Sequence, residues 1–120
     1  MGDLSKHFSR SEIECNCGCG LNEMSPITLE IAEVARSFVG SSITPSSGAR
    51  CYEYNRSEAV GSNDNSQHPR CKAMDLPCDD PESLFDYLCD KYPEQYGFGL
   101  YNTFVHIDSK TGAGRRWDSR

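Results

Sequence analysis

The chain lacks a long apolar run and is short of basic residues. None of its apolar stretches approaches the roughly 20 residues that a membrane-spanning helix needs, so we expect no membrane partner. Its 12 Lys and Arg against 18 Asp and Glu give a net charge of −6, whereas a nucleic-acid-binding domain normally carries a basic patch. The N-terminus, MGDLSKHFSR, lacks the apolar core of a secretory signal peptide. These absences predict a protein without a signal peptide and without a nucleic-acid or membrane partner.

The length and the cysteines bound the fold. The 120 residues, 37% of them hydrophobic, predict a single domain over residues 1–120 with a modest core. Seven cysteines are present, but no second pair with the spacing of a structural zinc site follows the cluster at Cys15, Cys17 and Cys19. We predict instead one disulfide that ties the Cys15–Cys19 loop to Cys51. The remaining cysteines are expected to be small buried apolar residues.

Capping residues and apolar spacing predict the helices. Ser9 starts a short helical turn over residues 9–14, and Ser25-Pro26 starts a longer helix that Gly40 ends. Asp80-Pro81-Glu82 starts another helix, which ends before Pro93. The residues predicted to face the core are Ile27, Ile31, Val34, Ala35 and Phe38 in the long helix, and Leu84, Phe85 and Leu88 in the later one.

Short strands are predicted between and after these helices. They cover residues 42–46, 72–76, 97–100 and 103–108, while residues 51–60 are expected to be helical and residues 61–66 to form a loop. Alternation in the last strand places Phe104, His106 and Asp108 on one face. The pattern therefore indicates an α+β fold with a small antiparallel sheet and flanking helices.

Two of the three histidines lie in unusual settings. His68 follows a polar loop, and Asp75 comes seven residues later between apolar neighbours. A carboxylate in such a place is costly to bury unless it is paired or binds a metal. His106 also lies between apolar residues, in the middle of a predicted strand. Two imidazoles and one carboxylate form a three-ligand zinc set that leaves a fourth position for water; the alternative is that the histidines are hydrogen-bonded structural residues.

The stretches around these residues resemble one known family in order and spacing. They are His7-Phe8, Cys15-Asn16-Cys17-Gly18-Cys19-Gly20, Ser47-Gly48-Ala49-Arg50-Cys51, Asn55, Ser66-Gln67-His68 with Ala73 and Asp75, Gly97-Phe98-Gly99-Leu100-Tyr101, Phe104-Val105-His106-Ile107-Asp108 and Arg116-Trp117. The family is that of the LAS-type zinc peptidases, which include D-alanyl-D-alanine carboxypeptidases, L-alanoyl-D-glutamate peptidases, phage endolysins and bacterial cell-wall endopeptidases. Hedgehog signalling domains share its fold. The resemblance implies a hedgehog/D-Ala-D-Ala-peptidase-like fold and is greatest to the short phage and bacterial branch.

The resemblance implies a role for each matching residue. His68, Asp75 and His106 match the ligands of Zn²⁺. Arg50 matches an arginine that binds substrate and supports the developing oxyanion, a task for which its planar fork of donors is suited. A structural salt bridge is the alternative for Arg50. Ser66 is expected to lie near the site, either in contact with substrate or as a cap of its loop.

The catalytic base is the point at which the chain departs from the family. Well-studied members carry Glu or Asp three residues before the last zinc ligand, where this chain has Thr103. Asp108 is the nearest candidate base because it shares a strand face with His106. The alternative is that Asp108 orients a metal ligand. The other candidates for the base are Glu94, Asp64 and His7.

The resemblance implies a zinc metallopeptidase that cleaves a peptide bond in the stem or cross-link of bacterial peptidoglycan. Carboxypeptidases and endopeptidases share the same ligand set, so the motifs do not choose between them. Peptidoglycan is the expected partner, and the protein is expected to be a monomer. It is expected to be phage-encoded or virion-associated, or held in the host cytoplasm before its release to the cell wall. Thr103 motivates the alternative of a catalytically inactive, zinc-stabilised cell-wall-binding or interaction module.

Overall fold

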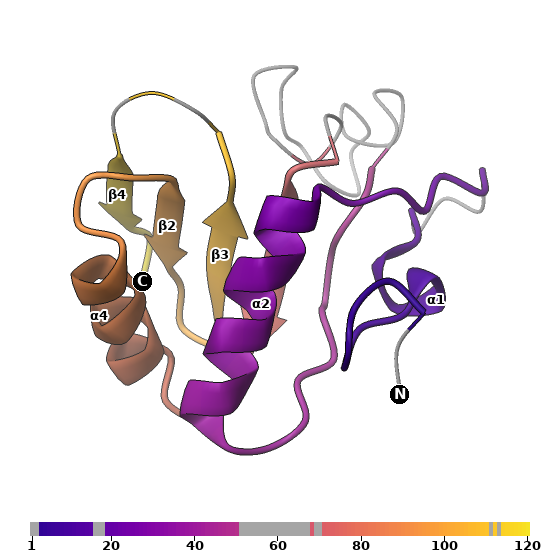
Figure 1. Ribbon diagram of the computed structural model, residues 1–120. Coiled ribbons are helices and arrows are strands. Elements are labelled where there is room, and N and C mark those ends of the chain that lie inside the picture. The colour runs from indigo at the N-terminus through magenta and orange to yellow at the C-terminus, as the bar shows by residue number, and fades with distance from the viewer. Residues whose placement is uncertain (1–2, 16–18, 51–67, 69–70, 111, 113) are drawn as a thin grey trace.

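A four-stranded sheet forms the centre of the computed structural model, which describes residues 3–15, 19–50, 68, 71–110, 112 and 114–120 (Figure 1). Its strands are β1 (Ala73–Pro77), β2 (Gly97–Leu100), β3 (Phe104–Asp108) and β4 (Arg115–Asp118), in the order β1-β3-β2-β4. The helices are α1 (Arg10–Ile13), α2 (Pro26–Val39) and α4 (Pro81–Lys91). Helix α2 packs against β1 and β3, and α4 packs beside it against β2. The predicted α+β class is confirmed.

The sheet is mixed, which corrects the prediction of an antiparallel sheet. Strands β1 and β2 both pair antiparallel with β3, as predicted, but β4 pairs parallel with β2. Because β3 already occupies one edge of β2, the chain that leaves β3 passes to the other edge of β2. The prediction omitted β4 because its sequence, RRWD, has no apolar alternation.

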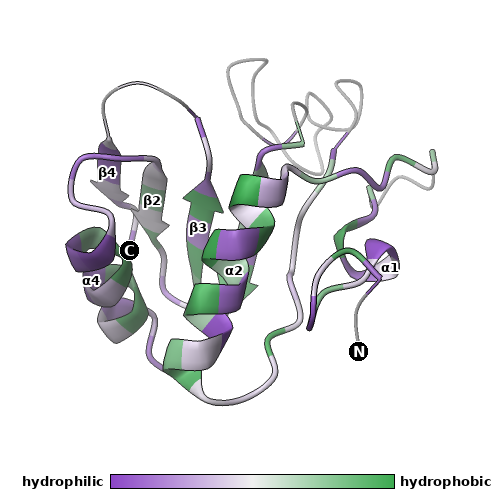
Figure 2. Ribbon diagram, in the orientation of Figure 1, coloured by the Kyte–Doolittle hydropathy of each residue, from purple (hydrophilic) through white to green (hydrophobic). Residues whose placement is uncertain are grey.

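Successive residues of each strand point to opposite faces of the sheet. One face is apolar and lies in a single core cluster with residues of α2 and α4. Figure 2 shows hydrophobic residues, in green, on both of these helices and on β3. Its strand residues are Met74, Leu76, Phe98, Leu100, Val105 and Ile107. The register places a different set on the other face, namely Asp75, His106, Asp108, Gly97, Gly99, Arg115 and Trp117. We call these two sides the helix face and the polar face.

Helix α2 begins and ends as predicted, but it packs through a different stripe. It starts at Pro26, and the N–H of Gly40 caps it by donating to the carbonyl oxygen of Arg36. The predicted inward residues Ile27 and Phe38 are 44% and 43% exposed. They lie in the first and last turns, and Phe38 stacks on Tyr87 of α4 with ring centroids 4.2 Å apart. The buried residues are Thr28, Leu29, Ile31, Ala32 and Ala35, so of the predicted set only Ile31 and Ala35 are buried.

The predicted helical turn after Ser9 and the predicted helix after Asp80 are confirmed. Asp80 accepts a hydrogen bond from the backbone N–H of Ser83 at the start of α4, and both Leu84 and Leu88 are buried. Helix α1 follows Ser9, whose backbone N–H donates to Glu12. None of the helices that the structure describes is both long enough and apolar enough to cross a membrane.

The predicted strand over residues 42–46 is wrong. This stretch contains Pro45, which has no N–H to donate to a strand ladder. Only Ser47, just after it, forms an isolated antiparallel bridge with Asp75. Three further predictions concern residues outside those that the structure describes. They are the helix over 51–60, the loop over 61–66 and the disulfide to Cys51.

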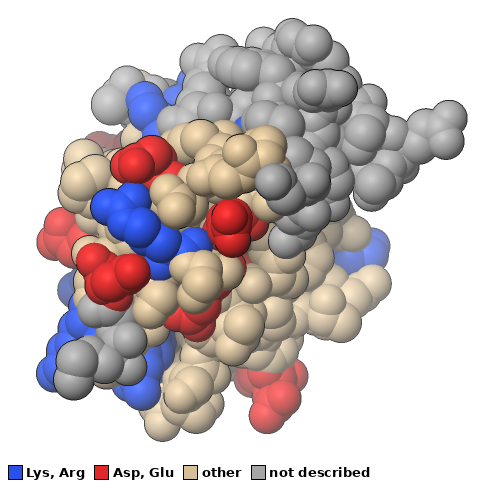
Figure 3. All heavy atoms as spheres, turned by 90° about the vertical axis from the view of Figure 1, so that its right-hand side faces the viewer, with Lys and Arg blue, Asp and Glu red and all other residues tan. Residues whose placement is uncertain are grey.

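The N-terminal segment is attached to the outer side of α2. Glu33 accepts hydrogen bonds from the Ser5 hydroxyl and the His7 backbone N–H, and it pairs with Nδ1 of His7 at 2.6 Å. Figure 3 shows acidic and basic side chains side by side on this side of the molecule. Arg10 and Glu23 form one such exposed pair at 3.2 Å.

Candidate metal centre

Three segments bring the predicted ligands together on the polar face. The register of β1 and β3 sets Asp75 directly opposite His106. His68 is brought to them by the segment around Gly48, whose carbonyl oxygen lies 2.7 Å from Nδ1 of His68. The three side chains are buried, and one ligand atom from each lies within 4.8 Å of the others.

The distances within this cluster suit a tetrahedral ion. Oδ1 of Asp75 lies 3.0 Å from Nδ1 of His106 and 3.5 Å from Nε2 of His68. Zinc bonds of about 2.0–2.1 Å in a tetrahedron place neighbouring ligand atoms about 3.3 Å apart. Each imidazole has its second nitrogen beside an oxygen atom, which is the arrangement that fixes the tautomer of a histidine ligand. The residues therefore fit Zn²⁺.

Burial and pairing adjust the charges of the three groups. Burial alone raises the pKa of Asp75, but the hydrogen bonds from His106 and His68 hold it well below its usual value, so Asp75 is a carboxylate. Burial lowers the pKa of His68, which favours the neutral ring that a metal ligand requires. Burial also disfavours the charged form of His106, but Asp108 and Asp75 raise its pKa.

Asp108 lies on the far side of the His106 ring from the cluster. Its Oδ2 is 2.9 Å from Nε2 of His106, whereas Asp75 contacts Nδ1. Its Oδ1 accepts hydrogen bonds from the Lys110 backbone N–H and from Nη2 of Arg115. Burial raises the pKa of Asp108, but His106 and Arg115 together bring it below its usual value. Asp108 has no exposed surface, and these contacts suit a carboxylate that orients His106.

Arg50 is brought to the same cluster. Its Nη2 lies 3.5 Å from Oδ2 of Asp75, and its Nε donates to the Ser47 hydroxyl at 3.0 Å. The Asp75 carboxylate thus faces the two imidazoles with one oxygen and the guanidinium with the other. This ion pair is the salt bridge expected if Arg50 has a structural role. It also holds the guanidinium of Arg50 beside the candidate metal ligands. Ser66, the other residue predicted to touch substrate, lies outside the described residues.

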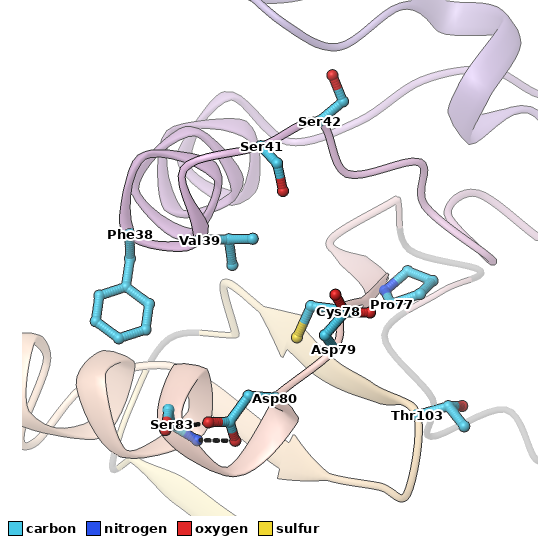
Figure 4. Close-up of a pocket in the computed structure, with 10 residues that line it drawn as sticks. All are labelled: Phe38, Val39, Ser41, Ser42, Pro77, Cys78, Asp79, Asp80, Ser83 and Thr103. Atoms are coloured by element: carbon cyan, nitrogen blue, oxygen red, sulfur yellow. Dashed lines mark hydrogen bonds between the residues drawn. The ribbon is translucent and has the colours of Figure 1, made fainter.

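Thr103 lies in another part of the molecule's surface, in the turn between β2 and β3. It lines a cavity of about 660 Å³ at the end of α2, to which none of the three ligands contributes (Figure 4). The cavity is lined by Phe38, Val39, Ser41, Ser42, Pro77, Cys78, Asp79, Asp80, Ser83 and Thr103. The other candidate bases are dispersed: His7 pairs with α2, Glu94 is exposed after α4, and Asp64 lies outside the described residues.

Two residues of β4, Arg115 and Trp117, had no predicted role at the site, although Trp117 lies in one of the stretches that carry the resemblance. The Trp117 ring lies 5.1 Å from the His106 ring, and its Nε1 donates to the Tyr101 hydroxyl at 3.1 Å. Arg115 reaches Asp108. A Cβ on Gly99 would lie 2.3 Å from the Trp117 indole, so the glycine makes room for it. Two glycines at alternate positions of β2 are the one local signal of such close approach.

Comparison with known proteins gives one finding. The family model described as Peptidase M15 matches residues 6–108, well over half of the chain. The matched stretch contains the three candidate ligands, Arg50 and Asp108, and it ends before β4. No curated protein matches the chain.

Proposed function

The chain belongs to the Peptidase M15 family, and from this premise we propose that it is a zinc metallopeptidase that cleaves peptide bonds in bacterial peptidoglycan. Membership confirms the family resemblance drawn from the motifs and supports a peptidase. The observation that supports a zinc site is the buried cluster of His68, Asp75 and His106, whose ligand atoms lie within 4.8 Å of one another. The substrate follows from the resemblance of the motifs to cell-wall peptidases.

The three ligands would hold Zn²⁺ through Nε2 of His68, Oδ1 of Asp75 and Nδ1 of His106. These are the atoms that face one another, because the second nitrogen of each imidazole is engaged elsewhere. When bound, zinc supplies a Lewis acid that activates water and polarises the scissile carbonyl group. Three protein ligands leave the fourth position for this chemistry.

Arg50 is the residue that places a positive side chain beside the proposed metal ligands. Its guanidinium stands beside Asp75, and its side chain is only 11% exposed, so little water competes for its donors. Donors fixed in such a place stabilise an oxygen on which negative charge develops in the transition state. We assign Arg50 to that oxygen and to substrate binding. Ser66, two residues before His68, is proposed to contact the substrate as well.

We assign Asp108 to the orientation of His106 rather than to proton uptake. Both of its oxygens are engaged, and it lies at the ring nitrogen that faces away from the ligand cluster. Its fixed carboxylate accepts a hydrogen bond from the Nε2–H group and so leaves Nδ1 of His106 with the lone pair that a metal requires.

Digestion of purified peptidoglycan tests the function and names the bond. We expect stem-peptide fragments in the mass spectrum, their loss after removal of the metal with a chelator, and their return when Zn²⁺ is restored. The fragments also distinguish a carboxypeptidase, which releases one terminal residue, from an endopeptidase. A parallel digest with His68→Ala controls for contaminating hydrolases. Fragments that persist after complete zinc removal would exclude the mechanism.

A second candidate is a zinc-stabilised wall-binding module without activity. It is favoured by Thr103, which stands where relatives carry an acid, and by the complete burial of Asp108. In that case the same digest yields no fragments, the protein still sediments with insoluble walls, and chelation lowers its melting temperature.

A phage-encoded or virion-associated origin is also part of the proposal. It rests on the resemblance of the motifs to the short phage branch. Holin or tail genes beside the coding sequence would support it.

A further inference from the structure

We propose that Arg115 is a positioning residue of the metal centre, which acts through Asp108 to hold the His106 ring in the orientation in which Nδ1 faces the other ligands. The inference rests on the zinc site of the proposed function. It concerns a residue of β4, beyond the end of the family match at Asp108.

The first observation is the chain of contacts from Arg115 to the ligand. Nη2 of Arg115 donates to Oδ1 of Asp108, and Oδ2 of the same carboxylate lies 2.9 Å from Nε2 of His106. Asp108 has no exposed surface, and a charge so deeply buried needs a partner of opposite sign. Among the residues that the structure describes, Arg115 is the one Lys or Arg residue whose side chain pairs with Asp108. It therefore offsets the charge of Asp108 and, together with the Lys110 backbone N–H, fixes the rotation of its carboxylate.

The second observation is that β2 leaves a passage for this contact. Asp108 lies on β3 and Arg115 on β4, with Gly97 of β2 between them in register with both. A Cβ on Gly97 would lie 2.5 Å from Nη2 of Arg115 and 2.6 Å from Oδ2 of Asp108. Any side chain at position 97 would thus displace one of the two groups. The guanidinium of Arg115 extends across β2 to reach the Asp108 carboxylate, instead of pointing into solvent.

The third observation is that Arg115 also supports the other neighbour of His106. Its guanidinium lies 5.7 Å from the centre of the Trp117 ring, which is itself 5.1 Å from the His106 ring. Arg115 thus contacts both groups that limit movement of the imidazole, one at Nε2 and one beside the ring. Loss of its side chain leaves Oδ1 of Asp108 with the Lys110 backbone N–H alone and loosens the packing of Trp117, so His106 gains alternative orientations.

Zinc affinity tests the inference without reliance on catalysis. Competition with a chromophoric chelator should show that Arg115→Met binds Zn²⁺ about 10–100-fold more weakly than the unmodified chain, the loss typical for partners of metal ligands. Arg115→Lys, which keeps the charge but lacks the planar fork, should recover part of this affinity. The visible absorption spectrum of the Co²⁺-loaded Arg115→Met protein should differ from that of the unmodified protein, because His106 is displaced.

Arg116→Met is the matched control. Arg116 is the next residue of β4 and carries the same charge, but its guanidinium donates to the backbone carbonyl oxygens of Tyr92, Gln95 and Tyr96 in the segment between α4 and β2. Its loss should lower the melting temperature and leave the zinc affinity of the folded protein unchanged. Gly97→Ala provides a second route to the same contact and should weaken zinc binding even if Arg115→Met does not fold.

The outcomes separate this inference from the proposed function. If Arg115→Met or, should that variant not fold, Gly97→Ala binds Zn²⁺ as tightly as the unmodified chain and gives the same Co²⁺ spectrum, Arg115 has only a structural role and the inference is overturned. If the unmodified chain itself binds no Zn²⁺, the proposed function is overturned, and the inference with it.

Discussion

Adjacent residues of β3 lie in two different environments. Val105 and Ile107 point to the helix face, where they are fully buried among apolar side chains of α2 and α4. His106 and Asp108 point to the polar face, where they are almost as deeply buried but hydrogen-bonded to charged partners. One strand thus carries a share of the hydrophobic core and a share of the metal centre. Because successive side chains of a strand point to opposite faces of the sheet, the two contributions are expected to separate under substitution.

The two faces also differ in what compensates for burial. On the helix face, removal of apolar surface from water is itself favourable. On the polar face, each buried carboxylate loses its hydration and regains interaction energy from cations and imidazoles. Asp75 has His68, His106 and Arg50 around it, and Asp108 has His106 and Arg115. A change on this face therefore acts on the chemistry first, whereas a change on the helix face acts on the free energy of unfolding.

The largest effect is expected from His106→Ala on the polar face. The substitution removes one of three ligands and leaves Asp75 and Asp108 without their shared partner. We expect peptidase activity to fall below detection and zinc affinity to fall by more than about 100-fold, beyond the loss seen for partners of ligands. Chelator competition measures the affinity, and far-ultraviolet circular dichroism establishes that the variant is folded. A variant that retains activity with Zn²⁺ would contradict the assignment of His106.

The next effect is expected from the neighbouring substitution Ile107→Ala on the helix face. Ile107 is fully buried in the core, and truncation of such a side chain costs about 2–5 kcal/mol of the free energy of unfolding. Urea unfolding of the zinc-free protein measures this loss. The folded variant should bind Zn²⁺ within about twofold of the unmodified chain, because its side chain faces away from the ligands. Weaker zinc binding with unchanged stability would break the division between the faces.

Local pattern explains why much of β1 and β3 was predictable. A period of two needs only neighbouring residues, so the sequence alone placed His106 and Asp108 on one face. The pairing of Asp75 with His106 then follows once β1 and β3 are adjacent. The ligand set itself came from the surrounding motifs rather than from spacing, and the structure brings those three residues together.

The features that the sequence did not predict depend on contacts between distant segments of the chain. Strand β4 exists because the free edge of β2 pairs with it, and nothing in RRWD signals that pairing. The Arg115–Asp108 contact needs the space above Gly97, which no linear pattern describes. The stripe of α2 was misjudged at Ile27 and Phe38 because periodicity does not tell where the sheet and α4 stop covering the helix.

A second histidine–carboxylate pair provides the mildest test of the comparison. His7 and Glu33 approach to 2.6 Å on the outer side of α2, but their side chains are 29% and 23% exposed, whereas those of His106 and Asp108 are 10% and 0% exposed. The contacts are chemically alike, and only their surroundings differ. An ion pair near water is worth about 1 kcal/mol or less, while a deeply buried one is strongly coupled to its partners.

Glu33→Gln should therefore cost no more than about 1 kcal/mol in the free energy of unfolding at neutral pH, and zinc affinity should not change. Burial raises the pKa of Glu33, but hydrogen bonds from Ser5 and His7 bring it below its usual value. A carboxylate with a lowered pKa stabilises the fold above its ordinary pKa and loses that contribution as the pH falls through its lowered value. The difference between the unmodified chain and Glu33→Gln should thus be full above about pH 5 and shrink below pH 4. Urea unfolding of both zinc-free proteins across this range measures the difference, with Glu30→Gln on the exposed side of α2 as the control. A difference that grows toward acid would show that the pair contributes mainly through a neutral Glu33, and the contrast with His106 and Asp108 would then reflect protonation as well as burial.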